Sequence, residues 1–243
     1  MSSPFPIITA DIRQSSTLSV LANDFELVLF IVSPGNRQAE SYQALYYAGL
    51  NNLLAHFPKV GSGPKWVMVS STSVYAQHCG EWVDEDSETS PLSPTAQWLV
   101  AAEQTLWQAD DVNCVVRFSG IYGPGRDWLL RRAAKGEAIQ QRPAIYTNRI
   151  HRDDCVAVLL YIIQKLLRGE VLQRCYLASD DDPAPLWDVM AWIAEQYGYS
   201  VPTPLLKESD AEQNKRCNNA RLKALGYRFL FPSYRDGYLN THA

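Results

Sequence analysis

The sequence predicts an α/β fold with a mostly parallel sheet flanked by helices, and three observations lead to this prediction. Strand-like and helix-like segments alternate along the chain, which is typical of parallel sheets. The strand-like segments are continuous apolar runs, as expected of strands covered on both faces. The 243 residues are 47% hydrophobic and 20% charged, which suits one globular domain or a domain with a small lobe.

The first strand–helix pair is expected before residue 60. Residues 25–32 read FELVLFIV, a buried strand that ends at the turn Ser33-Pro34-Gly35. Tyrosine and leucine recur at helical spacing over residues 39–57, which predicts a helix. Pro58 and the glycine-rich residues 61–64 are expected to end it.

The most informative segment is 66–75, which reads WVMVSSTSVY. A short apolar run ends in four consecutive hydroxyl residues. The carboxyl ends of parallel strands are where an open α/β sheet places its ligand. Hydroxyl groups clustered there can donate to a carbonyl group or a cofactor, which makes Ser71 the first candidate for chemistry. The alternative is that these serines only satisfy the backbone of a turn.

The alternation continues to the end of the chain. We expect an exposed acidic loop at 81–88 and a glycine-rich strand exit at 119–125. Helices are expected at 97–108, 154–167 and 185–197, and strands at 113–118 and 174–179. The tail, 214–238, is expected to hold a short helix that ends at Gly226, followed by aromatic-rich extended chain.

Composition and charge argue against several classes of protein. The net charge of −4 gives no reason to expect a nucleic-acid partner. The five cysteines are widely spaced without a C-x-x-C pair, so neither a metal site nor a disulfide framework is predicted. Reduced thiols and the lack of a recognisable signal peptide favour a cytoplasmic location. The most apolar stretch, 156–167, is too short to span a membrane.

Three motifs follow one another in a recognisable order: a strand ending SSTSVY, a strand ending RFSGIYGPGR, and NRIHRDD opening a helix. This order resembles the extended short-chain dehydrogenase family, and more narrowly the NAD-dependent epimerase/dehydratase group with its atypical, YeeZ-like members. The resemblance runs from about residue 10 to residue 238. It implies a Rossmann-like fold with NAD or NADP as cofactor. Residues 1–125 would form the cofactor-binding domain, and 126–243 would add helices, late strands and a small substrate lobe.

The N-terminus departs from this pattern. The family begins with a strand, a glycine-rich turn and a helix that hold the pyrophosphate. Here the first glycine is Gly35, and residues 7–11 match a strand that follows that unit. The resemblance therefore implies that the first two strands and the phosphate loop are missing, through either a shortened coding sequence or natural loss. An uncovered apolar edge or helix face would favour aggregation or a homodimer.

The catalytic pair departs as well. The family uses a tyrosine as general acid or base, and a lysine four residues later lowers its pKa and holds the ribose. Aligning residues 101–103 with the family's small-small-Glu run places Thr95 and Leu99 at these two positions. Threonine is too weak an acid for this proton transfer and leucine carries no charge, although atypical members of the family also lack the tyrosine. Tyr75 is a candidate substitute, which the resemblance places in the turn after the serine-rich strand.

The resemblance assigns further candidates to two groups. The cofactor contacts lie at strand exits, namely Ser33, Pro34, Ser70, Phe118, Gly120 and Ile121. The small-molecule substrate contacts are Thr72, Arg126, Asn148 and Arg149. The guanidinium of Arg126 suits a phosphate, and a surface ion pair explains it equally well.

The polar run 147–154 precedes an apolar helix, so Asp153 or Asp154 is expected to be its N-cap. In nucleotide-sugar enzymes, the arginine that binds the diphosphate falls on Thr147. Arg149 is a candidate replacement two residues later. His151 matches a family histidine for which we expect a structural role.

Two main functional hypotheses follow. The first is an NAD(P)-binding, epimerase/dehydratase-like enzyme that transfers hydride on a nucleotide-sugar or related hydroxylated metabolite, with Ser71 polarising the reacting oxygen. The second is a non-catalytic member that binds a dinucleotide or metabolite as a sensor or scaffold. The lost tyrosine and lysine favour the second, and the retained motifs favour some ligand in the cleft. A third possibility is that the shortened chain binds no ligand well.

Overall fold

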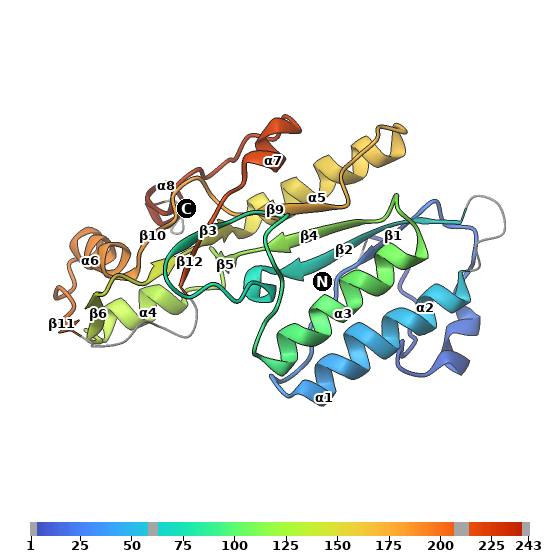
Figure 1. The fold of residues 1–243 in the computed structure, drawn as a ribbon, viewed down its shortest axis with the longest axis horizontal. Coiled ribbons are helices and arrows are strands. Elements are labelled where there is room, and N and C mark those ends of the chain that lie inside the picture. Colours follow the sequence, from blue (N-terminus) through green and yellow to red (C-terminus); the bar gives the residue numbers. More distant parts are fainter. Residues whose placement is uncertain (1–3, 58–62, 207–213, 240–243) are drawn as a thin grey trace. The chain divides into compact units, whose positions relative to one another are not determined.

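A computed structural model describes residues 4–57, 63–206 and 214–239 (Figure 1). The chain forms two compact units, each assembled from segments that are distant in sequence. The first unit comprises residues 1–70, 91–115 and 165–174, and the second comprises 71–90, 116–164 and 175–243. Pro58 and residues 61–62, predicted to end the first helix, lie outside the described residues.

The main sheet has the strand order β1-β2-β4-β9. These strands are β1 (Leu27–Phe30), β2 (Lys65–Ser71), β4 (Cys114–Phe118) and β9 (Cys175–Ala178). β1 and β2 pair in parallel, and every residue of β4 and β9 is buried, as expected of strands covered on both faces. The predicted α/β class with a parallel sheet is confirmed, although β1 is shorter than the strand expected at 25–32.

The helices of the first unit follow from the apolar spacing. The 3₁₀-helix η1 (Ser15–Val20) is followed by α1 (Ala39–Tyr42), the π-helical segment η2 (Gln43–Gly49), α2 (Leu50–His56) and α3 (Pro94–Ala109). The middle three form one continuous run, so the helix predicted at 39–57 is confirmed, with a π-helical segment that the sequence did not indicate. Figure 1 shows α2 and α3 side by side. α3 buries Leu99, Ala102 and Leu106, which share one helical face.

The second unit contains short strands and helices around its own core. The turn η3 (Thr72–Val74) is followed by β3 (Glu81–Val83), β5 (Gly120–Tyr122), α4 (Trp128–Ala134), β6 (Ile139–Arg142), β7 (Tyr146–Thr147), β8 (Arg149–His151), most of α5 (Arg152–Leu167), β10 (Ala184–Pro185), α6 (Leu186–Tyr197), β11 (Pro204–Leu206), β12 (Lys215–Cys217), α7 (Ala220–Ala224) and α8 (Tyr234–Leu239). Four two-stranded sheets pair β5 with β8, β12 with β3, β11 with β6, and β10 with β7. The core is formed by α4, α6, α8, β5 and β6 through Tyr122, Leu129, Ile139, Val189, Met190, Ile193 and Tyr234, among others.

Two expectations about the C-terminal half are wrong. The tail is not simply extended after Gly226, because it forms α8, in which the Tyr122 ring occupies the space of a Cβ at Gly237. Neither Asp153 nor Asp154 is an N-cap, because α5 already begins at Arg152. Instead, the buried Asp154 carboxylate anchors the tail: it accepts hydrogen bonds from the Tyr227 hydroxyl at 2.7 Å and from two backbone N–H groups, those of Leu230 and Phe231, at 2.8 and 2.9 Å.

The acidic segment 81–88 was expected to be exposed, but part of it is buried. Its first residues form β3, and Glu85 is buried. The Glu85 carboxylate accepts the backbone N–H of Leu177 at 2.7 Å and lies 3.5 Å from the Arg221 guanidinium. These partners are distant in sequence, so the local charge pattern could not indicate the burial. None of the helices in the three described ranges is long and apolar enough to cross a membrane.

Candidate functional site

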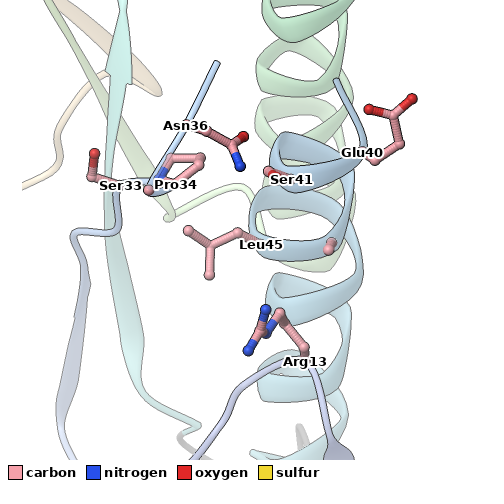
Figure 2. Close-up of a pocket in the computed structure, with 9 residues that line it drawn as sticks. Arg13, Ser33, Pro34, Asn36, Glu40, Ser41 and Leu45 are labelled. Atoms are coloured by element: carbon pink, nitrogen blue, oxygen red, sulfur yellow. The ribbon is translucent and has the colours of Figure 1, made fainter. Parts of the chain in front are cut away.

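A cavity of about 430 Å³ lies in the first unit, between the segment that follows β1 and the start of the α1–η2 helix (Figure 2). Ser33 and Pro34, two of the predicted cofactor contacts, line it. The other lining residues are Arg13, Gly35, Asn36, Glu40, Ser41, Ala44 and Leu45. Figure 2 shows Leu45 pointing from the helix toward the Ser33–Pro34 segment, with Arg13 reaching in from a loop.

The polar groups of this cavity differ in how far they are already used: the Asn36 side-chain oxygen accepts the N–H of Gln38 at 3.0 Å. Ser33 is exposed, and its hydroxyl makes no hydrogen bond with another described residue. Arg13 donates two hydrogen bonds to the Asp11 carboxylate, at 2.9 and 2.7 Å, and these bonds hold the pKa of Asp11 at about 2. The side chain of Arg13 is nevertheless 59% exposed. Hydroxyl, amide and guanidinium groups beside apolar carbon suit a ligand that combines a ring with hydroxyl or phosphate groups.

At the end of β2, by contrast, the hydroxyl groups already have partners. The Ser70 hydroxyl donates to the buried Glu103 carboxylate at 2.6 Å. The Ser71 Oγ accepts the backbone N–H of Ser73 at 3.1 Å and so caps the η3 turn. The Ser71 side chain can still donate its own proton, because a hydroxyl both donates and accepts. Ser71 thus satisfies the backbone of a turn, the alternative that the sequence also allowed, and its hydroxyl proton is still available for a ligand.

Tyr75 is fully buried at the end of the same turn. Its hydroxyl accepts a hydrogen bond from the Arg117 guanidinium at 2.8 Å, and the guanidinium lies 5.1 Å from the ring centroid. Burial raises the pKa of the Tyr75 phenol above its usual value. An enclosed phenol with a raised pKa is poorly suited to accept or release a proton. The contacts therefore favour an anchoring role for Tyr75.

A second cavity, of about 270 Å³, lies within the second unit. Five of the predicted site residues line it, namely Gly120, Ile121, Arg126, Asn148 and Arg149. They meet because β5 and β8 pair in parallel, with Gly120 opposite Arg149. The remaining wall is largely apolar and is formed by Tyr122, Trp128, Leu129, Thr147, Leu186 and Tyr238. Ser70, Ser71, Thr72 and Phe118 line neither this cavity nor the first.

Arg149 is buried and is held in the wall by hydrogen bonds. It donates to the Thr147 hydroxyl and, at 2.9 Å, to the backbone oxygen of Asp182. Its Nε lies 4.0 Å from Oδ2 of Asp180, too far for a hydrogen bond, and both atoms lack a partner among the described residues. Burial raises the pKa of Asp180 to about 8. Arg149 and Asp180 thus form a buried, incompletely satisfied pair behind the cavity.

Asn148 and Arg126, the other two polar residues predicted for this wall, differ in whether their side chains are available to bind a ligand. Both ends of the Asn148 amide are used: its oxygen accepts the N–H of Cys217 at 2.7 Å, and its nitrogen donates to the carbonyl of Lys215 at 2.9 Å. Arg126 is exposed and makes no ion pair with any residue that the structure describes. Of the predicted substrate contacts, Arg126 is therefore better placed than Asn148 to bind an anion.

The remaining motif residues have structural surroundings. His151 is buried, with its ring 5.3 Å from that of Tyr122 and 3.9 Å from that of Phe231, and burial lowers its pKa. Thr95 is in the first turn of α3, 2.8 Å from the Ser93 hydroxyl, and Leu99 is buried in the same helix. Across the described ranges, no group of three His, Cys, Asp or Glu residues is placed to hold a metal ion.

Sequence reasoning missed several cavity residues. Asn36 directly follows the predicted Ser33-Pro34-Gly35 exit, so its position offered a signal. Arg13 comes from a loop, and Trp128 opens a helix, so neither position follows a strand of the main sheet. Only the folded backbone brings these two side chains to the cavities.

Comparisons with known proteins give three informative structures. No protein-family model matches the sequence, and no curated protein matches it. A protein from Methylobacillus flagellatus, provisionally assigned as an NAD-dependent epimerase/dehydratase, is 33% identical over 100% of this chain and 85% of its own, with a TM-score of 0.82. A conserved protein of unknown function from Silicibacter pomeroyi is 30% identical over 86% and 74%, with a TM-score of 0.68. The dTDP-glucose 4,6-dehydratase of Bacillus anthracis, solved with NAD, shares the fold at 17% identity over 96% and 77%, with a TM-score of 0.75.

Proposed function

The chain belongs to the NAD-dependent epimerase/dehydratase family, and we propose that it binds NAD or NADP and acts on a nucleotide-sugar or a related hydroxylated metabolite. The observation that carries the proposal is the 33% identity with the Methylobacillus flagellatus protein over the whole of this chain. The dehydratase from Bacillus anthracis, which has the same fold, holds NAD. A family that handles a cofactor and a hydroxylated substrate needs cavities with a few polar groups, and each unit has one.

The cavity after β1 supports the cofactor part of the proposal. The free Ser33 hydroxyl, the Asn36 amide and the Arg13 guanidinium would bind hydroxyl or phosphate groups, while Pro34 and Leu45 offer apolar surface to a base. When bound, NAD or NADP would supply the hydride acceptor or donor. Ser70, Phe118, Gly120 and Ile121 stay predicted cofactor contacts.

The cavity lined by Arg126 supports the substrate part. Its apolar wall suits a ring, Trp128 offers an aromatic surface, and Arg126 would bind a phosphate or carboxylate group. Ser71 and Thr72 stay predicted contacts of the reacting end of the substrate, where Ser71 would donate a hydrogen bond to the reacting oxygen.

A second candidate function is a non-catalytic binding protein, and one observation favours it. Leu99 is buried in the core face of α3, and Thr95 is an ordinary first-turn residue beside Ser93. The resemblance places the tyrosine and the lysine of the family's catalytic pair at these two positions. A protein with this helix could retain ligand binding without turnover.

Thermal-shift titration with NAD and with NADP tests cofactor binding. At about a hundredfold excess over the Kd, a bound cofactor is expected to stabilise the protein by about 2.7 kcal/mol. Leu45→Trp should abolish this shift because its larger side chain fills the first cavity, whereas Leu92→Trp, at an 88% exposed residue, should retain it. The absence of a shift with both cofactors would contradict the proposal.

Turnover separates the two candidate functions. Conversion of each member of a panel of nucleotide-sugars in the presence of the cofactor is followed by NMR, because epimerisation and dehydration return the hydride and leave no net reduced cofactor, and the wild type is compared with Ser71→Ala and the neighbouring Ser73→Ala. If Ser71 donates to the reacting oxygen, Ser71→Ala should lower kcat by about a hundredfold, while Ser73→Ala should change it little. Cofactor binding without turnover across the panel would favour the non-catalytic candidate.

A further inference from the structure

Trp128, the first residue of α4, lines the second cavity with a side chain that the fold uses little. It is 59% exposed. It is not among the described residues that form the core of the second unit or pack against it, although its neighbours Leu129 and Leu130 are. Tryptophan is highly buried on average, so an indole left open beside a cavity is an informative exception. Its surface is available for contact with a ligand.

The indole is nevertheless held in place on one side. Arg132 lies one turn further along α4, and its guanidinium carbon is 4.6 Å from the centroid of the Trp128 ring, within the range of a cation–π contact. The Nε of Arg132 in turn donates a hydrogen bond to the Glu137 carboxylate at 2.6 Å. Glu137 therefore holds Arg132, and Arg132 holds the indole.

This arrangement leaves one face of the indole to the cavity. Trp128 lines the cavity and Arg132 does not, so the guanidinium covers the face of the ring that is turned away from the cavity. A planar ring of a ligand can stack on the opposite face. Because Arg132 and Glu137 already order the indole, less conformational entropy is lost when the ligand binds.

The charges around the cavity limit which ring can bind there. Arg126 and Arg149 line it, and the acids beside Arg132 and Arg149, namely Glu137 and Asp180, lie outside the wall. A positively charged ring on the indole would be close to several guanidinium groups and would meet no acidic residue in the wall. A neutral ring avoids this repulsion. An anionic group attached to the ring can bind the exposed Arg126 guanidinium.

We propose that Trp128, positioned by Arg132 and Glu137, selects ligands that carry a neutral planar ring together with an anionic group, as in a nucleotide with a neutral base. The proposal rests on the proposed function in one respect, that the second cavity belongs to the substrate site. It gives that site a specificity-determining residue, Trp128, and two positioning residues. It also assigns the cavity to the substrate rather than to the cationic nicotinamide ring of an oxidised cofactor.

Three probes that share a ribose phosphate test the proposal by calorimetric titration of the wild-type protein at neutral pH. UMP has a neutral base, ribose 5-phosphate has no base, and oxidised nicotinamide mononucleotide has a cationic ring. UMP should bind about tenfold more tightly than either of the others. Equal affinities for UMP and ribose 5-phosphate overturn the proposal. Nicotinamide mononucleotide that binds as tightly as UMP also overturns it, as does a failure of all three probes to bind.

Matched tryptophan variants locate the effect at the indole. Trp128→Ala should weaken UMP binding about tenfold and leave the affinity for ribose 5-phosphate unchanged. Trp82 is the control, because it is 55% exposed and lies 5.0 Å from the Arg216 guanidinium but does not line the cavity. Trp82→Ala should bind UMP as the wild type does, and urea unfolding checks that both variants are folded. An equal effect of the two substitutions on UMP binding, or no effect of Trp128→Ala, overturns the proposal.

Arg132→Met tests the positioning role, because Arg132 does not line the cavity and can reach the ligand only through the indole. This variant keeps an apolar side chain and should weaken UMP binding about two- to fivefold, with no change for ribose 5-phosphate. Arg132→Lys keeps the charge and should recover part of the loss. In the Trp128→Ala background, Arg132→Met should have no further effect. The same loss in both backgrounds overturns the positioning role.

Glu137→Gln should weaken UMP binding in the same direction as Arg132→Met and by less, because the Arg132 guanidinium stays in place with a weaker partner. A Glu137→Gln variant that binds UMP more tightly than the wild type overturns its positioning role. NAD and NADP thermal shifts and the conversion of nucleotide-sugars report separately on the proposed function. The two can therefore fail independently.

Discussion

β1 and β2 are neighbouring parallel strands that both lead into polar residues, yet the fold uses those residues in opposite ways. After β1, Ser33 is exposed, and its hydroxyl makes no hydrogen bond with any other residue that the structure describes. At the end of β2, Ser70 donates a hydrogen bond to Glu103, Ser71 caps a turn, and Tyr75 is buried against Arg117. The first exit presents a free hydroxyl to a cavity, whereas the polar groups of the second make hydrogen bonds within the fold.

The position of each strand in the sheet explains the difference. β2 has a neighbour on both sides in the strand order, whereas β1 lies at one end of it. Buried polar groups beside a central strand need hydrogen-bond partners within the protein, whereas exposed polar groups beside an edge strand can bond to solvent or to a ligand. Substitutions of Ser70 and Tyr75 should therefore act mainly on stability, and substitutions after β1 should act mainly on binding.

The largest effect is expected from Arg117→Ala. This change leaves the buried Tyr75 hydroxyl without its donor and opens a cavity beneath the turn, so the free energy of unfolding should fall by about 3–5 kcal/mol. Urea unfolding followed by circular dichroism measures it. Tyr75→Phe, which keeps the ring, should cost less, about 1–3 kcal/mol. A loss below about 1 kcal/mol for Arg117→Ala would contradict the anchoring role.

Asp180 should make the stability of the second unit depend on pH. Its pKa is raised from 3.8 to about 8 by burial, so the protonated acid is favoured in the folded state. The stabilising contribution is complete below about pH 4 and is lost as the pH rises toward about 8, at up to about 1.4 kcal/mol per pH unit. Asp180→Asn should remove this decline. Urea unfolding of both proteins between about pH 5 and about pH 8 provides the measurement, and parallel curves would show that Asp180 stays ionised beside Arg149.

Ser70→Ala should have an intermediate effect. The Ser70 hydroxyl donates to the Glu103 carboxylate, which is 1% exposed, and its loss leaves a buried acceptor with one donor fewer. The expected loss is about 1–3 kcal/mol of unfolding free energy by urea titration. Adding Glu103→Gln to Ser70→Ala should recover part of the loss, because the neutral amide is less costly to bury. No recovery would mean that other contacts of Glu103 dominate.

The sequence predicted the framework and part of the cavities because both depend on local patterns. Apolar runs mark β2 and β4, and helical spacing marks α3. The resemblance carried by the GIYGPGR and NRIHRDD motifs gave Arg126 and Arg149 as candidate substrate contacts. Both line one cavity, Arg149 on β8 and Arg126 in the turn that follows β5.

The rest depends on contacts between distant residues, which leave no local pattern. Glu85 is buried because Leu177 and Arg221 reach it, and Arg149 turns into the wall because Asp180 and Asp182 lie behind it. Lys215, which is buried, drew no attention in the sequence, since a lone lysine usually marks an exposed surface.

The smallest effect on stability, and the sharpest contrast with β2, is expected from Ser33→Ala. The exposed Ser33 hydroxyl makes no hydrogen bond within the described chain, so the free energy of unfolding should change by less than about 0.5 kcal/mol. If Ser33 donates to NAD or NADP, the same substitution should weaken cofactor binding by about 0.5–1.5 kcal/mol, up to roughly tenfold in Kd. Calorimetric titration measures the affinity, and urea unfolding measures the stability. Ser70→Ala should show the reverse order of effects when both losses are expressed as free energies, because its hydroxyl serves the fold. A Ser33 variant that loses stability and keeps its affinity would remove the distinction between the two strand ends.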